Sequence, residues 1–145
     1  MTTKTNAASG GAEFNWPVRV YYEDTDAAGV VYHSNYLKYM ERARTEWLRA
    51  TGFSHEQLRE REGVIFVVTD MTISFKKPAC MDQQIEVRVS LIEAGGASLR
   101  FLQTIINESQ ELLCAAEVNV ACLDSGSMKP KRIPNPIKVE LTHVD

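Results

Sequence analysis

The segment from residue 22 to residue 36 gathers the side chains most suited to chemistry. It holds three carboxylates, a loop glycine and a histidine next to the longest helical pattern of the chain: Glu23, Asp24, Asp26, Gly29 and His33. A carboxylate at the mouth of a buried helix can act as a nucleophile or as a general base. The helix N-terminus offers unpaired N–H groups and a partial positive charge to a developing oxyanion. Together these features predict the two halves of an acyl-transfer site.

The same residues also allow a purely structural interpretation. Asp24 and Asp26 can accept hydrogen bonds from the backbone of a turn, and His33 can simply precede a helix. Because acidic turns are common, the spacing alone favours this interpretation over the catalytic one.

A strand and a helix must position this segment. Residues 16–22 alternate bulky apolar and polar side chains and predict a strand. Residues 34–50 predict the only long helix, with Ser34 or Asn35 as its N-cap and Gly52 just beyond its C-terminus. The apolar stripe of this helix consists of Tyr36, Met40, Ala43 and Trp47, with Leu37, Arg44 and Leu48 alongside.

The rest of the chain predicts a short helix and then strands. Residues 54–62 open with a capping-box pattern, and strands are expected at 64–75, 85–91, 98–106 and 112–123. Gly95 and Gly96 are expected to supply the positive φ of a hairpin turn. One strand, one long helix and four further strands make an α+β plan, with the sheet curling around the helix. Leu102 and Ile106, expected on the outer face of the sheet, predict association into a dimer or larger assembly.

Composition and charge limit the class of function. The chain has 145 residues, 44% of them hydrophobic, as expected for one soluble globular domain. We expect a disordered tail over residues 1–13 and the domain over residues 14–143. The net charge of −3 argues against nucleic acid as a partner. No apolar stretch is long enough for a membrane span or a signal peptide, so a cytoplasmic location is expected.

The cysteines and histidines form no metal-binding pattern. Cys80, Cys114 and Cys122 include no CxxC pair and are interpreted as reduced thiols, the last two in the core. The three histidines are scattered along the chain without the spacing of metal ligands. We therefore expect no metal.

A basic segment runs from Met128 to Lys138. It contains four cations and no anion: Lys129, Lys131, Arg132 and Lys138. On an acidic protein such a segment suggests a small anionic ligand, and a solvated loop is the alternative. Lys76 and Lys77, before Pro78, allow the same two interpretations: a phosphate contact or a solvated turn.

The acidic segment belongs to a longer sequence pattern. VRVYYEDTDAAGVVYHSNY begins at Val18, and YMERARTE begins at Tyr39. FVVTDMT, FKKPA, AEV and MKPKRIP follow later in the chain. Over residues 16–140 the sequence closely resembles the hotdog-fold acyl-CoA thioesterases of the 4-hydroxybenzoyl-CoA thioesterase class. Within that class it is most similar to the YbgC-type subgroup, which is encoded with the Tol–Pal envelope system.

This resemblance implies a fold, a reaction and a site. The fold would be a curved antiparallel sheet wrapped around one long helix, dimerising edge to edge and often forming a dimer of dimers, a homotetramer. The reaction would be hydrolysis of an acyl-CoA thioester to free acid and CoA without metal or cofactor, with acyl carrier protein as an alternative carrier. Matched by position, the catalytic carboxylate is Asp26. The backbone amide that polarises the thioester carbonyl is that of His33, whose side chain is implicated as well.

The resemblance also places substrate-binding residues. The pocket is expected to include Tyr22, Gly29, Asn35 and Tyr36. We expect the CoA phosphates to contact Lys129, Lys131 and Arg132. One departure from the family is the pair Ala27-Ala28, where many members have Pro or Gly. Both alanines are small, so the substrate can still approach closely.

Two other functions compete with the thioesterase. A protein of the same fold could act as a scaffold at phospholipid-synthesis enzymes or at the Tol–Pal machinery, but the retained Asp26 beside Gly29 and His33 favours an enzyme. A hotdog dehydratase would need its catalytic histidine on a helix, whereas His33 is expected to precede one.

Overall fold

The computed structural model describes residues 13–142. The tail predicted over residues 1–13 lies outside the described residues except for Glu13. The elements are β1 (Phe14–Arg19), a 3₁₀ turn η1 (Tyr22–Asp24), α1 (His33–Ala50), α2 (His55–Gln57), a π turn η2 (Leu58–Glu62), β2 (Val64–Phe75), β3 (Gln84–Ala94), β4 (Ser98–Ile106), β5 (Leu112–Asp124) and α3 (Asn135–Thr142).

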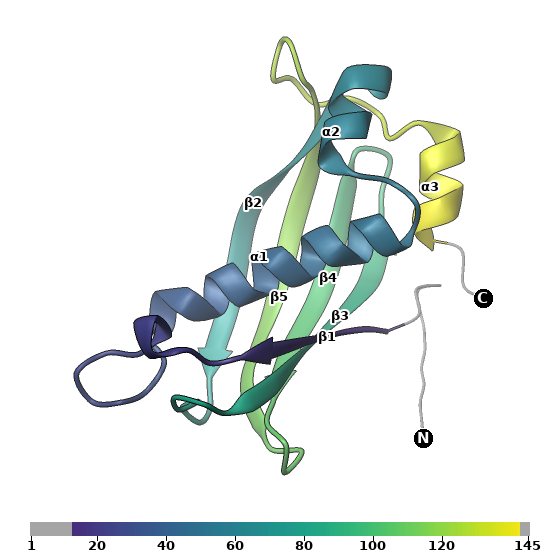
Figure 1. Cartoon of the computed structure of the whole chain (residues 1–145). Helices are drawn as coiled ribbons and strands as arrows, with labels where there is room; N and C mark the ends of the chain where they lie inside the picture. The colour runs from purple at the N-terminus through teal and green to yellow at the C-terminus, as the bar shows by residue number, and fades with distance from the viewer. Residues whose placement is uncertain (1–12, 143–145) are drawn as a thin grey trace.

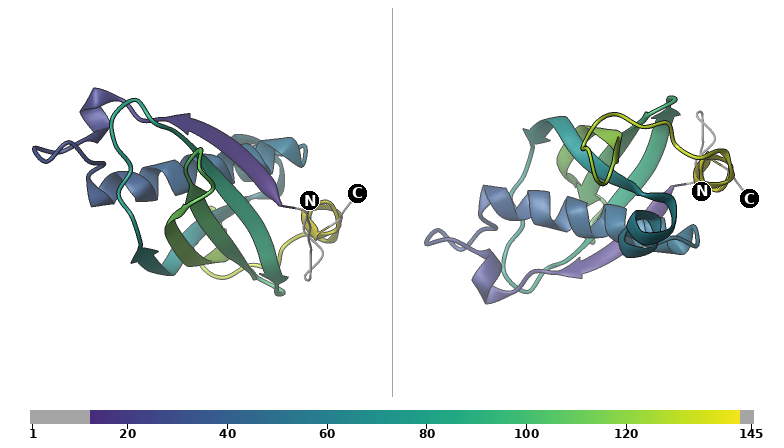
Figure 2. Two further views of the ribbon diagram at one scale, coloured as in Figure 1. Left: turned by 90° about the horizontal axis from the view of Figure 1, so that it is seen from below. Right: turned by 90° about the horizontal axis from the view of Figure 1, so that it is seen from above.

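The five strands form one antiparallel sheet in the order β1-β3-β4-β5-β2. β3, β4 and β5 make the predicted meander, and β2 lies at one edge, paired only with β5. The sheet curves around α1, which crosses one of its faces (Figures 1 and 2). This arrangement confirms the α+β plan and the curved sheet around one long helix.

The helix α1 is held against the sheet by its apolar stripe. All four predicted core positions are buried, and so are Tyr39 and Leu48; Met40 and Ala43 are fully inaccessible. Full burial of a large apolar side chain such as that of Met40 contributes about 1.5–3 kcal/mol. Leu37, placed alongside the stripe by its spacing, is 41% exposed instead. Gly52 follows the helix with φ +104°, in the left-handed region expected beyond a helix C-terminus.

Two expectations about the ends of these elements were wrong. β1 ends at Arg19 rather than at residue 22, because the Asp24 carboxylate accepts the Tyr21 N–H and the chain turns into η1. α1 begins at His33, with Tyr32 as a cap residue that makes no side-chain cap bond. Neither Ser34 nor Asn35 is the N-cap, because they are the second and third residues of the helix; the Asn35 amide donates to Asp24. His33 is therefore the first residue of the helix rather than the residue before it.

The turn between β3 and β4 also differs from expectation. Neither Gly95 nor Gly96 has a positive φ. A Cβ on Gly95 would lie 2.6 Å from Ser98 Oγ, and one on Gly96 would lie 3.4 Å from Arg132 Nη1. Space rather than backbone conformation therefore favours a small residue at Gly95, whereas the contact at Gly96 is of ordinary length.

Bulges break the strand alternation at a few positions. Leu102 is 40% exposed on the outer face, as predicted, but Ile106 is buried because the register shifts between Ile105 and Ile106.

The helix α3 was missed by sequence reasoning, although Ile137 and Leu141 are spaced by one helical turn and both are buried. Its eight residues include Pro136 and follow Pro134, so the pattern resembles a loop.

Predictions at the short helical segment and at two cysteines are confirmed. The Ser54 side chain accepts the Gln57 N–H at 3.2 Å, as the capping pattern predicts, and Gly63 ends this segment with φ +68°. Cys114 and Cys122 are fully buried free thiols, and burial raises the pKa of Cys114 to about 11. They are thus core residues, not nucleophiles.

Candidate active site

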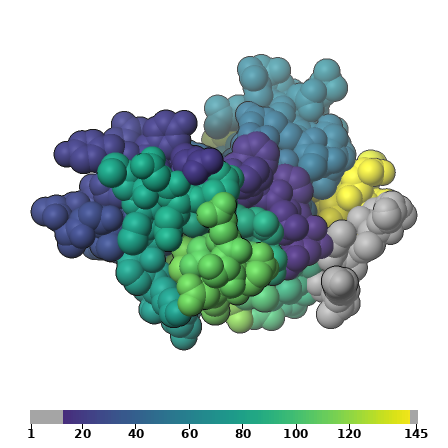
Figure 3. Space-filling view, turned by 60° about the horizontal axis from the view of Figure 1, so that its bottom comes forward, coloured from purple at the N-terminus to yellow at the C-terminus, as the bar shows by residue number. Residues whose placement is uncertain are grey.

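The acidic segment forms a loop that protrudes beside the N-terminus of α1 (Figures 1 and 3). Isolated β-bridges pair Thr25 with Val31 and Val30 with Cys80, and the Val31 N–H donates to Ala79 O at 2.8 Å. These bridges close the loop at its base. The turn that carries Asp26 is therefore held at a fixed place next to the helix.

Asp26 opens a tight turn within this loop. Its Oδ1 accepts the Ala28 N–H at 2.8 Å, and its carbonyl accepts the Gly29 N–H at 2.9 Å. Gly29 has φ +81°, a conformation that side chains rarely adopt, so the turn requires glycine there. Asp26 is exposed, and its Oδ2 bonds to none of the residues 13–142. One carboxylate oxygen is thus held by the turn, and the other has no hydrogen-bond partner among the described residues.

Asp24 has a structural role. The structural interpretation of the sequence had assigned such a role to both Asp24 and Asp26. Its Oδ2 accepts the Tyr21 N–H and its Oδ1 accepts the Asn35 amide, both at 2.9 Å, while its carbonyl accepts the Tyr32 N–H at 3.0 Å. Burial, with Asp24 nearby, holds the pKa of Tyr39 above its usual value. Asp24 therefore fastens the loop to the first turn of α1.

His33 offers a backbone donor at the start of α1. In the described part of the chain nothing accepts its N–H, as expected at the first position of a helix. Its exposed imidazole lies 4.4 Å from the Tyr32 ring and 6.4 Å from the Phe75 ring, measured between centroids. The free N–H and the free oxygen of Asp26 belong to the same loop–helix junction.

The predicted pocket residues take different places. Tyr22 is 80% exposed on η1. Asn35 is bound to Asp24, and Tyr36 is buried with its hydroxyl accepting the Ala79 N–H at 3.0 Å. Burial raises the pKa of Tyr36. Asn35 and Tyr36 therefore hold the loop and the 79–80 segment against α1.

The basic segment lies at the other end of the strands. It follows Asp124, which pairs with Val64 at the start of β2, whereas the acidic loop bonds to Ala79, just after β2 ends at Phe75. The length of β2 separates the two ends by roughly 35 Å. Figures 1 and 2 show the acidic loop and the segment that leads into α3 at different ends of the molecule.

The four cations of this segment are not equally free. Lys131 donates to Glu62 O at 3.2 Å and lies 3.6 Å from Asp124 Oδ1. The Arg132 guanidinium packs next to Gly96, while Lys129 is exposed. Lys138 belongs to α3.

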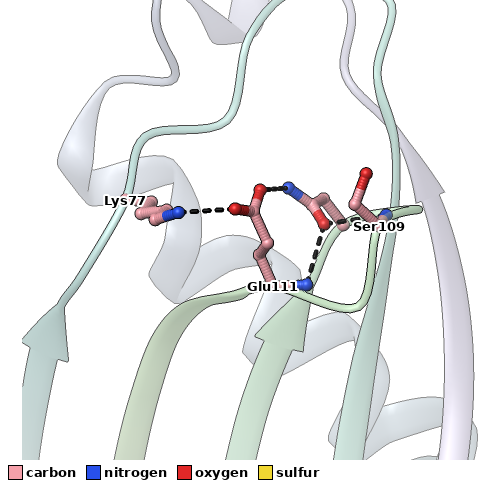
Figure 4. A network of polar contacts seen from close by, with 4 residues as sticks. Lys77, Ser109 and Glu111 are labelled. Atoms are coloured by element: carbon pink, nitrogen blue, oxygen red, sulfur yellow. Dashed lines mark hydrogen bonds and ion pairs between the residues drawn. The ribbon is translucent and has the colours of Figure 1, made fainter.

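Lys77 is bound within the protein. Its amino group pairs with Glu111, whose carboxylate also accepts the Asn107 amide, and Asn107 accepts the backbone N–H groups of Ser109 and Glu111 (Figure 4). The hydrogen bonds from Lys77 and Asn107 hold the pKa of Glu111 below its usual value. The network favours the solvated turn over a phosphate contact at Lys77.

A cavity of about 640 Å³ lies between α1 and the sheet. Its walls come from α1, β2, β4 and β5, and include Leu37, Phe66, Met71, Phe101 and Val120. None of the four residues expected in the pocket, Tyr22, Gly29, Asn35 and Tyr36, lines this cavity.

Arg44 and Gln103 were missed as functional candidates. Arg44 lines the cavity and donates from Nη1 to Gln103 Oε1 at 2.8 Å; Gln103 is fully buried and donates to Met40 O at 3.0 Å. The alternation of β4 could have placed Gln103 on the inner face, between Phe101 and Ile105.

Residues 13–142 contain neither a metal-binding cluster nor a membrane-spanning helix. No group of three or more His, Cys, Asp or Glu side chains there could hold a metal ion. No helix in this range is long and apolar enough to cross a membrane.

Comparison with known proteins identifies the family. A family model described as the thioesterase-like superfamily matches residues 20–141. The acyl-CoA thioester hydrolase YbgC of Escherichia coli O6:H1 is 49% identical over 127 residues, covering 88% of this chain and 94% of that protein. The acyl-CoA thioesterase YbgC of Haemophilus influenzae is 43% identical over 131 residues, with coverage of 90% and 96%.

The solved structures agree with the sequence comparison. A probable thioesterase from Bartonella henselae superposes with a TM-score of 0.80 at 37% identity, covering 85% of this chain and all of that one. The hotdog fold is thereby confirmed, as is the thioesterase family in place of a dehydratase. The chain belongs to the thioesterase-like superfamily.

Proposed function

We propose that this protein hydrolyses the thioester of an acyl-CoA to a free acid and CoA. One observation carries the proposal: Asp26 presents a free carboxylate oxygen on the same loop–helix junction as the unpaired His33 N–H. The names of the Escherichia coli and Haemophilus influenzae relatives support acyl-CoA as the substrate.

The reaction needs a carboxylate and an oxyanion donor. The His33 N–H donates to the thioester carbonyl oxygen, which becomes negative as the tetrahedral intermediate forms. Asp26 either attacks the carbonyl carbon and forms an anhydride that water then hydrolyses, or removes a proton from the attacking water. In both routes the C–S bond breaks, CoA leaves as a thiolate that takes up a proton, and water supplies the second oxygen of the acid.

We further propose that two copies pair through β2. This edge strand is hydrogen-bonded on one side only and spans twelve residues, and an unpaired edge of that length is a template for another strand. A two-fold axis makes two identical edge strands antiparallel. The start of β2 in one subunit, with the basic segment beside it, then approaches the end of β2 in the other, with the acidic loop beside it.

This pairing would bring Lys129, Lys131 and Arg132 of one subunit towards Asp26 of the other. Replacing all three cations by alanine should raise KM for acyl-CoA and leave kcat nearly unchanged, because phosphate contacts bind ground state and transition state alike. The effect should shrink as salt rises, since exposed charges are screened over about 10 Å at 0.1 M. An unchanged KM would make the segment a solvated loop.

Mixed dimers can show whether the site spans two subunits. Co-expression of the Asp26→Asn chain with the triple-alanine chain gives heterodimers in which one site keeps both Asp26 and the cations. Such heterodimers should regain the wild-type KM. If the cations served Asp26 of their own chain, each site would lack one or the other, and the KM would stay high.

The function itself is tested with a panel of acyl-CoAs from short chains through aroyl to palmitoyl, followed by release of free thiol. Turnover of at least one of them, lost in Asp26→Asn, supports the enzyme. Without turnover, tight binding to acyl carrier protein would instead support the scaffold hypothesis. A cytoplasmic location and assembly into a tetramer stay predictions.

A further inference from the structure

The cavity between α1 and the sheet follows the face of α1 that begins at His33, although no residue of the candidate active site lines it. Leu37, at its rim, lies one helical turn after His33 and therefore on the same face of α1. Glu41 and Thr45 continue this face along the cavity wall. An acyl group whose carbonyl is held at the His33 N–H therefore has an apolar space ahead of it along the helix.

The far part of the cavity contains an unneutralised cation. Arg44 lies about 16 Å along the helix axis from His33 and forms no ion pair with any of the described residues. Its guanidinium is half-buried, with one hydrogen bond to Gln103. Trp47 and Phe101 stack edge to face, with centroids 5.0 Å apart, and both also line the cavity. A guanidinium has five donors, so most of those of Arg44 remain available.

The other charged groups around the cavity do not neutralise Arg44. Lys38 is a second cation, and Glu41, the one lining carboxylate of the described residues, acts on Arg44 only at longer range. His55 also lines the cavity, and burial, together with Arg49 and Arg44, lowers its pKa, which favours the neutral imidazole. Burial likewise lowers the pKa of Arg44, an environment in which an anionic partner is favourable.

We propose that this cavity takes the acyl group of the substrate and that Arg44 selects acyl groups whose far end carries a carboxylate. The inference rests on the proposed acyl-CoA hydrolysis and adds a substrate class to it. A planar guanidinium binds a carboxylate through two parallel hydrogen bonds, and the partial burial of Arg44 reduces competition from water. The methylene chain of a dicarboxylic acyl group suits the apolar part of the cavity.

The experiment compares acyl-CoAs in pairs of equal length. Hexanoyl-CoA is paired with adipoyl-CoA, octanoyl-CoA with suberoyl-CoA, and decanoyl-CoA with sebacoyl-CoA. For at least one pair, the ratio of kcat/KM for the dicarboxylic member to that for the alkyl member should fall about tenfold to a hundredfold in Arg44→Met, the usual effect of losing one charged hydrogen bond. Arg44→Lys keeps the positive charge but not the planar pair of N–H donors. Its ratio should therefore lie between those of the wild type and Arg44→Met.

A matched pair of variants separates selectivity from packing. Arg44→Met leaves the buried Gln103 without its donor, so the unfolding temperature should fall as well. Arg44→Met with Gln103→Leu removes both partners and should recover stability without recovering the ratio. Gln103→Leu alone keeps the guanidinium but removes the one hydrogen bond that holds it, so the ratio should fall less than in Arg44→Met.

The outcomes test the role of Arg44 and acyl-CoA hydrolysis separately. A ratio that is the same in wild type and Arg44→Met, or that returns in the double variant, overturns the role of Arg44 and leaves acyl-CoA hydrolysis standing. If the wild-type protein hydrolyses none of the acyl-CoAs, including the short-chain, aroyl and palmitoyl members of the wider panel, acyl-CoA hydrolysis fails and the selectivity fails with it.

Discussion

Asp26→Asn should lower kcat by about 10²–10⁴ or more, as expected when a general base or nucleophile is deleted. The amide keeps the shape of the side chain, and its oxygen can still accept the Ala28 N–H, so the turn should remain intact. The substitution removes the negative charge from Oδ2, the oxygen to which no described residue forms a hydrogen bond. The measurement is steady-state thiol release from the best substrate of the panel, with circular dichroism to show that the fold is retained.

Two neighbouring carboxylates supply matched controls for Asp26. Glu23→Gln removes one negative charge from the same exposed loop and should keep kcat close to wild type. Asp24→Asn weakens the contacts to Tyr21 and Asn35 and should lower thermal stability together with activity. If Asp26→Asn keeps more than about a tenth of the wild-type kcat, or if Glu23→Gln is equally damaging, Asp26 is not the reacting carboxylate.

The sequence predicted the helices and strands in which apolar residues recur at a regular spacing. The stripe of α1 and the alternation of β3, β4 and β5 each bury one face, so the pattern of apolar residues determines both the element and its orientation. The helix α3 was missed because it is short and rich in proline at its start. The end of β1 was misplaced because a side chain of the loop, Asp24, competes with the strand for the Tyr21 N–H.

The site was predictable in part for a related reason. Composition located the acidic segment, but Asp24 and Asp26 look alike in a sequence. Only the partner of Asp24, the Asn35 amide from the first turn of α1, separates an anchoring carboxylate from a free one. Similarly, nothing local indicates that the basic segment lies a full strand away from Asp26, because that separation depends on how β2 pairs with β5.

His33→Pro should abolish most activity, while His33→Ala should cost at most about tenfold. Proline deletes the N–H that we assign to the oxyanion, and removal of one such donor costs about 10²–10³ in kcat. The helix should tolerate it, because proline suits the first helical position and Tyr32, with φ −64° and ψ 135°, already has the backbone that precedes a proline. Alanine keeps the N–H and removes only an exposed ring that packs beside Tyr32 and Phe75.

The two variants distinguish a backbone role from a side-chain role. If the imidazole were a general base, His33→Ala would itself cost about 10²-fold or more. It would also remove a limb of the pH–rate profile in the range where imidazoles titrate. The expected result is instead a large gap between the two variants with similar circular dichroism spectra and unfolding temperatures. Equal activity of folded His33→Pro and His33→Ala would exclude the N–H of His33 as the oxyanion donor, because proline is the one side chain that removes it.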